Sequence, residues 1–316
     1  MNRTVVTWEP GMRPLGRACV AIGVFDGVHR GHQELLDQTL QDARNHGARA
    51  IAVTFDRDPD QVVTPETAAP QLLRLEDKID AILAHGMSVV LVVPFTAQMA
   101  ATGAEEFLDE VLGQCCEVVS VHVGKDFRFG RGASGDLDTL YVWGIEHNID
   151  VVGHSLLEVQ GHPVSSTRIR GLIAVGDIAS AMDLLGYAPR LTGVVVHGRG
   201  EGTALGFATA NVEPDEFSAL PASGVYAGIA QLQDGTRWAA AISVGVPPTF
   251  PQASDYLEAH IIDYAGDLYG QRVTLDFYRR LRDQEHFDSF EALKAQIGRD
   301  ISATIDLVCE NRNLEC

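Results

Sequence analysis

Short β-branched runs alternate with helical patterns through the first half of the chain. The apolar runs lie at residues 18–25, 50–55, 88–93, 118–123 and 149–152. A helical pattern over residues 33–46 stops before Gly47, and a second over residues 75–85 stops before Gly86, as helices often do. Near-continuous apolar strands separated by helices predict a parallel sheet covered by helices on both faces.

The pattern changes after two short helical stretches, at residues 167–175 and 177–185. From there on, turns separate strand-like runs at residues 191–197, 224–232, 238–244, 257–263 and 272–278. A last helical pattern covers residues 289–305, and we expect Leu293, Ile297 and Ile301 to face the strands. The second half therefore predicts a small antiparallel β-barrel with a C-terminal helix.

A chain of 316 residues exceeds the roughly 100–200 residues of a typical domain. We therefore expect two domains, at residues 1–186 and 187–316. No apolar run approaches the ~20 residues of a membrane helix, and the five cysteines contain no Cys-x-x-Cys pair. The formal net charge of −19 argues against nucleic acid as a partner. These features predict a cytoplasmic protein, a monomer or a homo-oligomer, that acts on small molecules.

The segment VFDGVHRGHQELL, residues 24–36, places polar residues and glycines between the first apolar run and the first helix. Open α/β sheets bind ligands at the carboxyl ends of their strands. Gly27 and Gly31 let the backbone approach a phosphate, and the helix start supplies unpaired N–H groups. His29 and His32 could both donate to phosphate oxygens, as displacement at phosphorus requires. The segment predicts a phosphate site, and the plainer alternative is a surface turn with incidental histidines.

A metal site is the other interpretation of His29 and His32, with Asp26 as the near candidate for a third ligand. The zinc-helix signature, however, places its histidines four positions apart with a glutamate between them. We therefore favour phosphate chemistry at this turn.

Several segments of the first half resemble, in order, the adenylyltransferase domain of prokaryotic FAD synthetases. GVFDGVHRGH (residues 23–32) is similar to the His-x-Gly-His segment of nucleotidylyltransferases, and VTFD, VGKDFRFGRGASG and VSSTRIR follow it. The second half resembles a riboflavin kinase domain through LGFATAN, GVYAG, SVGVPPTF, LEAHIID, DLYG and HFDSFEAL. The resemblance implies a Rossmann-like nucleotidylyltransferase domain, a riboflavin kinase-like barrel, and the activities of a bifunctional riboflavin kinase/FMN adenylyltransferase.

In the first domain, the resemblance implies that FMN attacks the α-phosphorus of ATP, with His29 and His32 as catalytic residues. It assigns to the ATP phosphates Gly23, Phe25, Asp26, Gly27, Gly31, Ser165, Ser166, Thr167 and Arg168. It assigns to the flavin Asp56, Asp126, Phe127 and Phe129. Taken alone, the SSTR segment is better explained as a helix N-cap, and either phenylalanine could simply fill the core.

In the second domain, the resemblance implies transfer of the γ-phosphoryl group of ATP to the 5′-hydroxyl of riboflavin. Glu258 would be the catalytic base, because a neutral hydroxyl is a poor nucleophile. Thr209 and Asn211 would hold Mg²⁺ and the ATP phosphates, and Arg282 would contact the flavin. A glycine-rich flap would cover the nucleotide with Gly198, Gly200 and Gly202, although turns between strands also need glycine.

Four segments depart from the family pattern. Asp58 stands where the family usually has a histidine, Ala208 where it has a proline, and Gln284 where it commonly has a glutamate. Thr203 and Ala204 stand where the flap usually carries a Lys or Arg. These departures favour one alternative, an adenylyltransferase with a weak or inactive kinase barrel. Two further alternatives are an enzyme for a flavin analogue and a non-catalytic flavin or nucleotide sensor.

Overall fold

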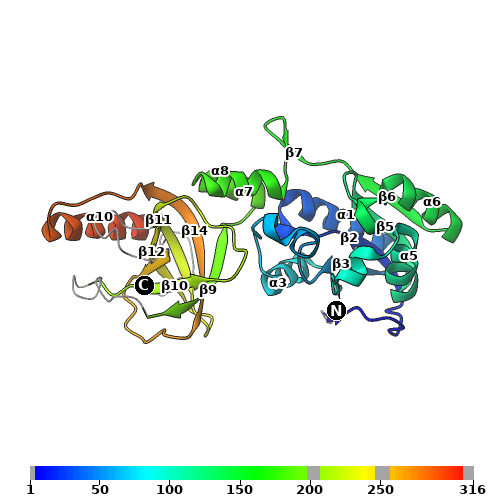
Figure 1. Cartoon of the computed structure of the whole chain (residues 1–316), viewed down its shortest axis with the longest axis horizontal. Helices are drawn as coiled ribbons and strands as arrows, with labels where there is room; N and C mark the ends of the chain where they lie inside the picture. Colours follow the sequence, from blue (N-terminus) through cyan, green and yellow to red (C-terminus); the bar gives the residue numbers. More distant parts are fainter. Residues whose placement is uncertain (1–3, 198–206, 246–256, 309–316) are drawn as a thin grey trace. The chain divides into compact units, whose positions relative to one another are not determined.

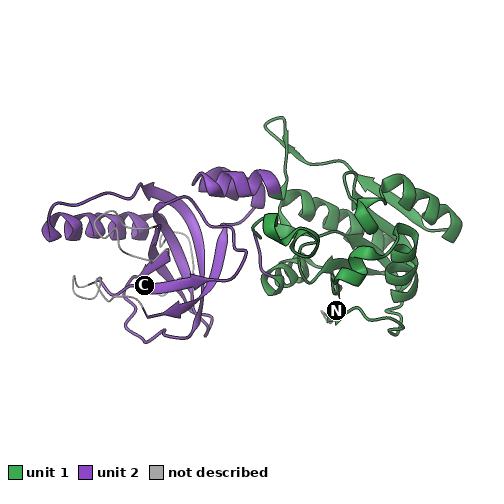
Figure 2. Ribbon diagram, viewed as in Figure 1, with its two compact units in different colours: residues 1–71, 75–166 green, residues 72–74, 167–316 purple. Residues whose placement is uncertain are grey.

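The computed structural model describes residues 4–197, 207–245 and 257–308. The chain divides into two compact units, residues 1–71 with 75–166 and residues 72–74 with 167–316 (Figure 2). Helices α7 (Ser166–Ala174) and α8 (Ile178–Leu185) belong almost entirely to the second unit, and Ile178 lies in the core of its barrel. The boundary that the sequence suggests at residues 186 and 187 stays a prediction.

The first unit is built on a six-stranded parallel sheet, as the sequence predicted (Figure 1). Its strand order is β1-β4-β3-β2-β5-β6. The strands are β1 (Thr4–Thr7), β2 (Arg17–Ile22), β3 (Arg49–Phe55), β4 (Val89–Val93), β5 (Glu117–Gly124) and β6 (Asp150–His154). Residues 18–22 of β2 are all buried, so both faces of the sheet are covered. A small hairpin, β7 (Glu158–Val159) and β8 (His162–Pro163), follows the sheet.

Helices connect the strands of this sheet. They are α1 (Arg30–His46), α2 (Asp60–Val63), α3 (Leu75–His85), α4 (Ala97–Ala101), α5 (Ala104–Phe107) and α6 (Leu137–His147). Shorter turns are the 3-10 helices η1 (Asp26–Val28), η2 (Pro65–Thr67) and η4 (Arg131–Ala133) and the π-helical turn η3 (Leu108–Gly113). The strand expected over residues 18–25 ends early, because Phe25 adopts a left-handed φ of 55° that no strand can continue.

The second unit is a closed antiparallel barrel in the order β10-β13-β12-β11-β14-β9, which confirms the predicted architecture. Its strands are β9 (Arg190–Val196), β10 (Ala210–Pro214), β11 (Gly224–Gln231), β12 (Arg237–Val244), β13 (Leu257–Ile261) and β14 (Arg272–Arg282). Alternate residues fill the interior, with the rings of Tyr226 and Phe277 packed edge to face at 5.5 Å. The barrel therefore has a hydrophobic core of its own.

Helix α10 (Phe290–Val308) packs against β11 and β12. The expectation for Ile301 is confirmed, since it packs against the buried cluster that includes Ile229 and Ile262. Leu293 and Ile297, in contrast, are only partly buried. The fully buried residues of the helix are instead Asp300, Thr304 and Val308. Asp300 and Thr304 lie three positions after Ile297 and Ile301, so they share the predicted face of the helix. Hydrophobic periodicity thus finds this face but not the polar residues buried most deeply on it.

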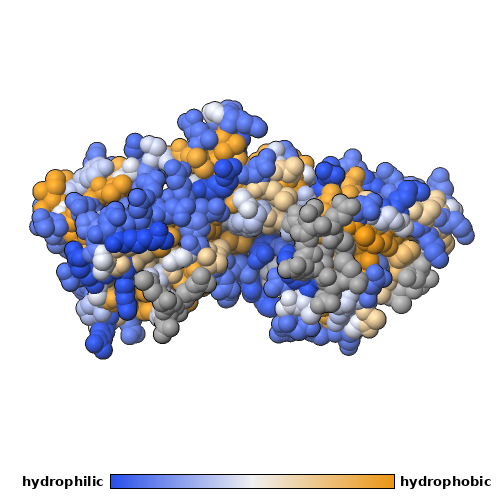
Figure 3. Space-filling view, turned by 180° about the vertical axis from the view of Figure 1, so that it is seen from behind, coloured by the Kyte–Doolittle hydropathy of each residue, from blue (hydrophilic) through white to orange (hydrophobic). Residues whose placement is uncertain are grey.

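The face drawn in Figure 3 is largely hydrophilic, with hydrophobic side chains in separate small groups. Within the described residues, no helix combines the length and the apolar character needed to cross a membrane.

Candidate active sites

The histidine-bearing turn, residues 23–32, begins directly after β2. Strand β2 pairs with β3 on one side and with β5 on the other. The strands that follow β2 along the chain first extend the sheet on the β3 side and then on the β5 side, so the order of the strands reverses at β2. Crevices at such switch points are where open parallel sheets bind ligands. The turn therefore lies at the expected ligand-binding edge of the sheet.

His29 and His32 come together at the start of α1. Their rings stack with centroids 3.6 Å apart and planes 12° apart. His29 is the N-cap of α1, and its Nδ1 accepts a hydrogen bond of 3.3 Å from the backbone N–H of His32. Because Nδ1 accepts this hydrogen bond, it carries no proton, and the N–H of the His29 ring lies on Nε2. The sequence prediction that the two histidines act together is consistent with this geometry.

His32 is a neutral imidazole at pH 7. Burial, followed by the nearby His29 and Lys78, holds the pKa of His32 well below the usual 6.5. Its Nδ1 is buried and has no hydrogen-bond partner in the part of the chain that the structure describes. An unsatisfied buried nitrogen is costly, so this atom is suited to contact a ligand. No group of three His, Cys, Asp or Glu side chains among the described residues is arranged to hold a metal ion.

Gly27 and Gly31 of the turn occupy positions where a side chain would meet a steric limit. Gly27 has a φ of 79°, which favours glycine. A Cβ on Gly31 would lie 3.3 Å from the His29 ring, and one on Gly23 would lie 3.4 Å from the Phe25 ring. A side chain in place of Gly31 would therefore press on the His29 ring, whereas one in place of Gly23 would only touch the Phe25 ring.

The segment that contains Ser165 and Ser166 reaches the same turn from far along the chain. The hydroxyl of Ser166 donates to the carbonyl of Asp26 at 2.9 Å. Ser166 is also the first residue of α7, and Thr167 and Arg168 follow in its first turn. Two motifs that lie 140 residues apart are therefore in direct contact.

The four residues proposed for the flavin differ in their surroundings. The Asp56 carboxylate accepts from the backbone N–H of Phe95 at 2.7 Å and from the Arg57 guanidinium. Asp126 is exposed after β5, and Phe127 is partly buried. Phe129 is 5% exposed and stacks on Phe127 within the core, so its ring is largely occupied by packing, as the alternative interpretation proposed. The role of these residues toward the flavin stays a prediction.

A second candidate site lies on the barrel. Glu258 on β13 is directly opposite Asn211 on β10 and Ser243 on β12, so the three side chains share one face. The Oδ1 atom of Asn211 is buried and lacks a hydrogen-bond partner among the described residues. An orphan carbonyl oxygen beside a carboxylate fits a site for a hard cation such as Mg²⁺.

A cleft of about 390 Å³ on the same two strands, β10 and β13, is lined by Thr209, Ala210 and Ala259, among others, but not by Glu258, Asn211 or Ser243. Just before Thr209, the carbonyl of Ala208 accepts a 2.8 Å hydrogen bond from Nδ1 of His260 on β13. This bond fixes the turn where the family's proline is missing. Gly198, Gly200, Gly202, Thr203 and Ala204, the residues of the expected flap, lie outside the described residues.

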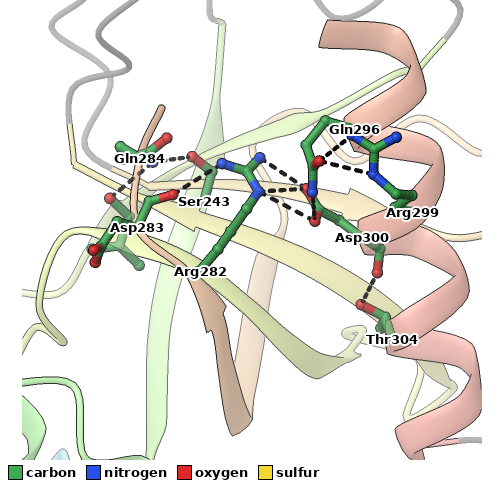
Figure 4. A network of polar contacts seen from close by, with 9 residues as sticks. Ser243, Arg282, Asp283, Gln284, Gln296, Arg299, Asp300 and Thr304 are labelled. Carbon is green, nitrogen blue, oxygen red and sulfur yellow. Dashed lines mark hydrogen bonds and ion pairs between the residues drawn. The ribbon is translucent and has the colours of Figure 1, made fainter. Parts of the chain in front are cut away.

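The end of β14 is fixed by two side chains (Figure 4). The Arg282 guanidinium binds the Asp300 carboxylate of α10, with Nη2 at 2.8 Å from Oδ2. Gln284 donates to the Ser243 hydroxyl at 2.8 Å and to the Val244 carbonyl at 3.1 Å. A glutamate could not donate to Val244, so Gln284 has a structural role of its own. The flavin contact proposed for Arg282 stays a prediction, since much of its guanidinium already binds Asp300.

A histidine-bearing turn at the end of a parallel strand, and a barrel that pairs a carboxylate with an asparagine, fit the phosphate-transferring enzymes that the sequence resembles. The two halves match two family models, that of FAD synthetase over residues 13–168 and that of riboflavin kinase over residues 185–308. Together the models cover most of the chain.

The bifunctional riboflavin kinase/FMN adenylyltransferase of Pseudomonas fluorescens is 38% identical over 92% of this chain and 94% of its own length. The protein of that name from Escherichia coli K12 is 35% identical over 89% and 90%. The chain belongs to this family. A crystal structure named as a macrolide-efflux protein from Streptococcus pneumoniae has a TM-score of 0.83 at 27% identity, covering 95% of this chain and 98% of that chain. This similarity supports the two-unit fold of the chain.

Proposed function

We propose that the chain makes FAD in two steps, phosphorylating riboflavin to FMN on the barrel and adenylylating FMN on the parallel-sheet unit. The observation that supports this most is that each unit presents its own site, built from residues of its own family motif. His29 and His32 stack at the ligand-binding edge of the sheet, and Glu258 lies opposite Asn211 on the barrel.

In adenylyl transfer, a phosphate oxygen of FMN attacks the α-phosphorus of ATP, and the bond to the departing pyrophosphate breaks. The residues of the turn stabilise the charge that develops on phosphorus by position and electrostatics. The imidazoles of His29 and His32 each supply a ring N–H to the phosphate oxygens, and burial keeps the ring of His32 neutral. The start of α1 adds backbone N–H groups, and its dipole favours the negative charge of the phosphates.

In phosphoryl transfer, Glu258 accepts the proton of the 5′-hydroxyl of riboflavin as its oxygen attacks the γ-phosphorus of ATP. Thr209 and Asn211 would hold Mg²⁺, which supplies charge neutralisation on the ATP phosphates when bound. Asn211 contributes its Oδ1, which has no hydrogen-bond partner in the described part of the chain. Ser243 lies on the other side of Glu258, and Gln284 fixes its hydroxyl.

The test is chromatography of the products from riboflavin with ATP and Mg²⁺, with FMN and ATP run in parallel. We expect FAD from both mixtures. FAD from FMN alone would identify an adenylyltransferase with an inactive barrel, and no product from either would favour a flavin analogue or a sensor.

The variant Glu258→Gln tests the kinase assignment. We expect it to lower FMN formation from riboflavin about 10²- to 10⁴-fold, since it removes a general base, and to leave adenylylation of supplied FMN unchanged. Glu213→Gln, an exposed change on β10, is the matched control. A Glu258→Gln enzyme with ordinary kinase turnover would refute the assignment.

A further inference from the structure

Lys78 is a buried ammonium that the proposed mechanism does not use. It lies on α3 and is 2% exposed. Its Nζ donates to the carbonyl of Val24 at 3.1 Å and to the carbonyl of Phe55 at 3.0 Å. Phe55 is the last residue of β3, and Val24 lies just after β2. Lys78 therefore links the carboxyl ends of two adjacent strands, at the edge where the histidine-bearing turn begins.

Three carboxylates compensate the charge of Lys78. Burial lowers its pKa, and Asp58, Asp26 and Asp56 act in the opposite direction. Asp58 and Asp26 are themselves buried, at 6% and 3% exposure. An ammonium stays inside a protein when carboxylates and hydrogen-bond acceptors surround it. Asp58, the departure from the family's histidine, is thus part of the environment that retains the Lys78 charge.

The carbonyl of Val24 accepts a second side-chain hydrogen bond. The hydroxyl of Thr54 on β3 donates to it at 3.0 Å. One peptide group is therefore held from two elements, by Lys78 of α3 and by Thr54 of β3. A carbonyl with two donors has little freedom to rotate.

This peptide precedes Phe25, which like Val28 is a non-glycine residue of the turn with a positive φ. Phe25 adopts its φ of 55° at a position where non-glycine residues pay a conformational cost, so the surroundings must enforce it. The Phe25 ring is 1% exposed and meets the His32 ring edge to face at 5.3 Å. His32 in turn stacks on His29. The orientation of the Val24 peptide is thus transmitted to the imidazole through a single residue.

We propose that Lys78 and Thr54 clamp the Val24 carbonyl and are positioning residues for adenylyl transfer, because they hold Phe25 and hence His32 in place. The inference rests on the proposed role of His32. It assigns the ammonium of Lys78 a function in turnover, beyond neutralising the buried aspartates.

Two variants test the clamp from its two ends. Lys78→Met keeps most of the stem and removes the donors, and Thr54→Val removes a hydroxyl without changing charge. We expect FAD formation from saturating FMN and ATP to fall about 10- to 100-fold in Lys78→Met and about tenfold in Thr54→Val, with KM for ATP changed less, since misplacing a catalytic group acts on turnover. The double variant should lose less than the product of the two effects, because both donors serve one acceptor.

The same chain supplies the internal control, since riboflavin phosphorylation on the barrel should be unchanged in every variant. Lys294→Met, an exposed change on α10, and Thr39→Val, which removes a buried hydroxyl within α1, are matched controls that should keep full adenylyl transfer. If Lys78→Met fails to fold, the rate of FAD formation by Thr54→Val alone tests the inference. The inference is overturned if Thr54→Val keeps full turnover, or if the two effects multiply as independent ones.

The variant His32→Asn separates this inference from the proposed function. If His32→Asn keeps adenylyl transfer, the assigned site is wrong. If His32→Asn loses it while the clamp variants keep it, the site stands and the clamp is wrong.

Discussion

Asp58 is a buried carboxylate that raises the pKa of the Lys78 ammonium against the larger lowering caused by burial. Replacing it by asparagine leaves that ammonium less compensated, so the pKa of Lys78 falls further below 10.5. At pH values between the pKa of Lys78 in the folded chain and its pKa in the unfolded chain, the unfolded chain binds more protons than the folded one. The free energy of unfolding therefore rises with pH in this range. We expect Asp58→Asn to lower the free energy of unfolding at pH 7 by on the order of 3 kcal/mol, with partial recovery on raising the pH.

The measurement is denaturant unfolding of the parallel-sheet unit at pH 7 and at higher pH. Asp80→Asn, an exposed change on the same helix α3, is the control and should be neutral at both values. An equal loss for Asp58→Asn at both pH values would mean that Asp58 does not act through Lys78.

Individual site residues were predictable where a motif fixed their order. The sequence placed His29 and His32 together because glycines, a strand and a helix start surround them. It did not predict Lys78, because a lysine in the helical pattern over residues 75–85 is ordinarily a surface residue. The available signal was spacing, since Lys78 lies four positions before Ile82, and both are buried on one face of α3.

Helix α10 is held to the barrel by an ion pair rather than by apolar contacts alone. The Arg282 and Asp300 side chains are 15% and 8% exposed, and Gln296 also donates to Asp300 (Figure 4). Removing one partner of a buried pair costs about 3–5 kcal/mol, because it strands the other charge, whereas an apolar replacement of both can be neutral. We expect Arg282→Met and Asp300→Leu each to destabilise the barrel by this amount, and the double variant to recover most of the loss.

Chemical unfolding of the barrel measures this effect, and Arg299→Met is the control, because Arg299 is exposed and binds Gln296 instead. Asp300→Leu also distinguishes the two proposed roles of Arg282, because it breaks the ion pair and leaves the Arg282 side chain in place. If KM for riboflavin rises in Arg282→Met and stays normal in Asp300→Leu, Arg282 contacts the flavin. A double variant as unstable as the single ones would contradict the ion-pair account.

Helices were predictable where the hydrophobic periodicity and a terminal glycine indicated the same boundary. The helix expected over residues 75–85 is found with those bounds, and Gly47 ends α1 with a φ of 59°. The four-residue strand β1 was missed because it is short and mostly exposed, unlike the central strands. Helix α6 was missed because its apolar residues point all round, with Tyr141, Val142 and Ile145 exposed. The barrel strand β10 is short as well, and no apolar run predicts it.

At the scale of the whole molecule, alternating strands and helices in one half and closely spaced strands in the other were enough to predict two different folds. Each unit has its own hydrophobic core, around β2, β3 and β4 in one and inside the barrel in the other. The sequence motifs then indicated a different reaction for each unit. The sequence predicted a barrel but not which strands close it, β9 with β10 and β14, because pairing between distant strands leaves no local pattern.

Separate cores and separate sites mean that the two reactions need not occur in the same molecule. We expect Glu258→Gln and His32→Asn chains, each unable to make FAD from riboflavin, to do so when mixed with ATP and Mg²⁺. FMN released by the His32→Asn chain is the substrate of the Glu258→Gln chain, so FAD should appear after a lag while FMN accumulates. Chromatography over time measures both flavins. If FMN accumulates and no FAD follows, although the Glu258→Gln chain adenylylates added FMN at that concentration, then the intermediate does not pass freely through solution and the two units depend on each other.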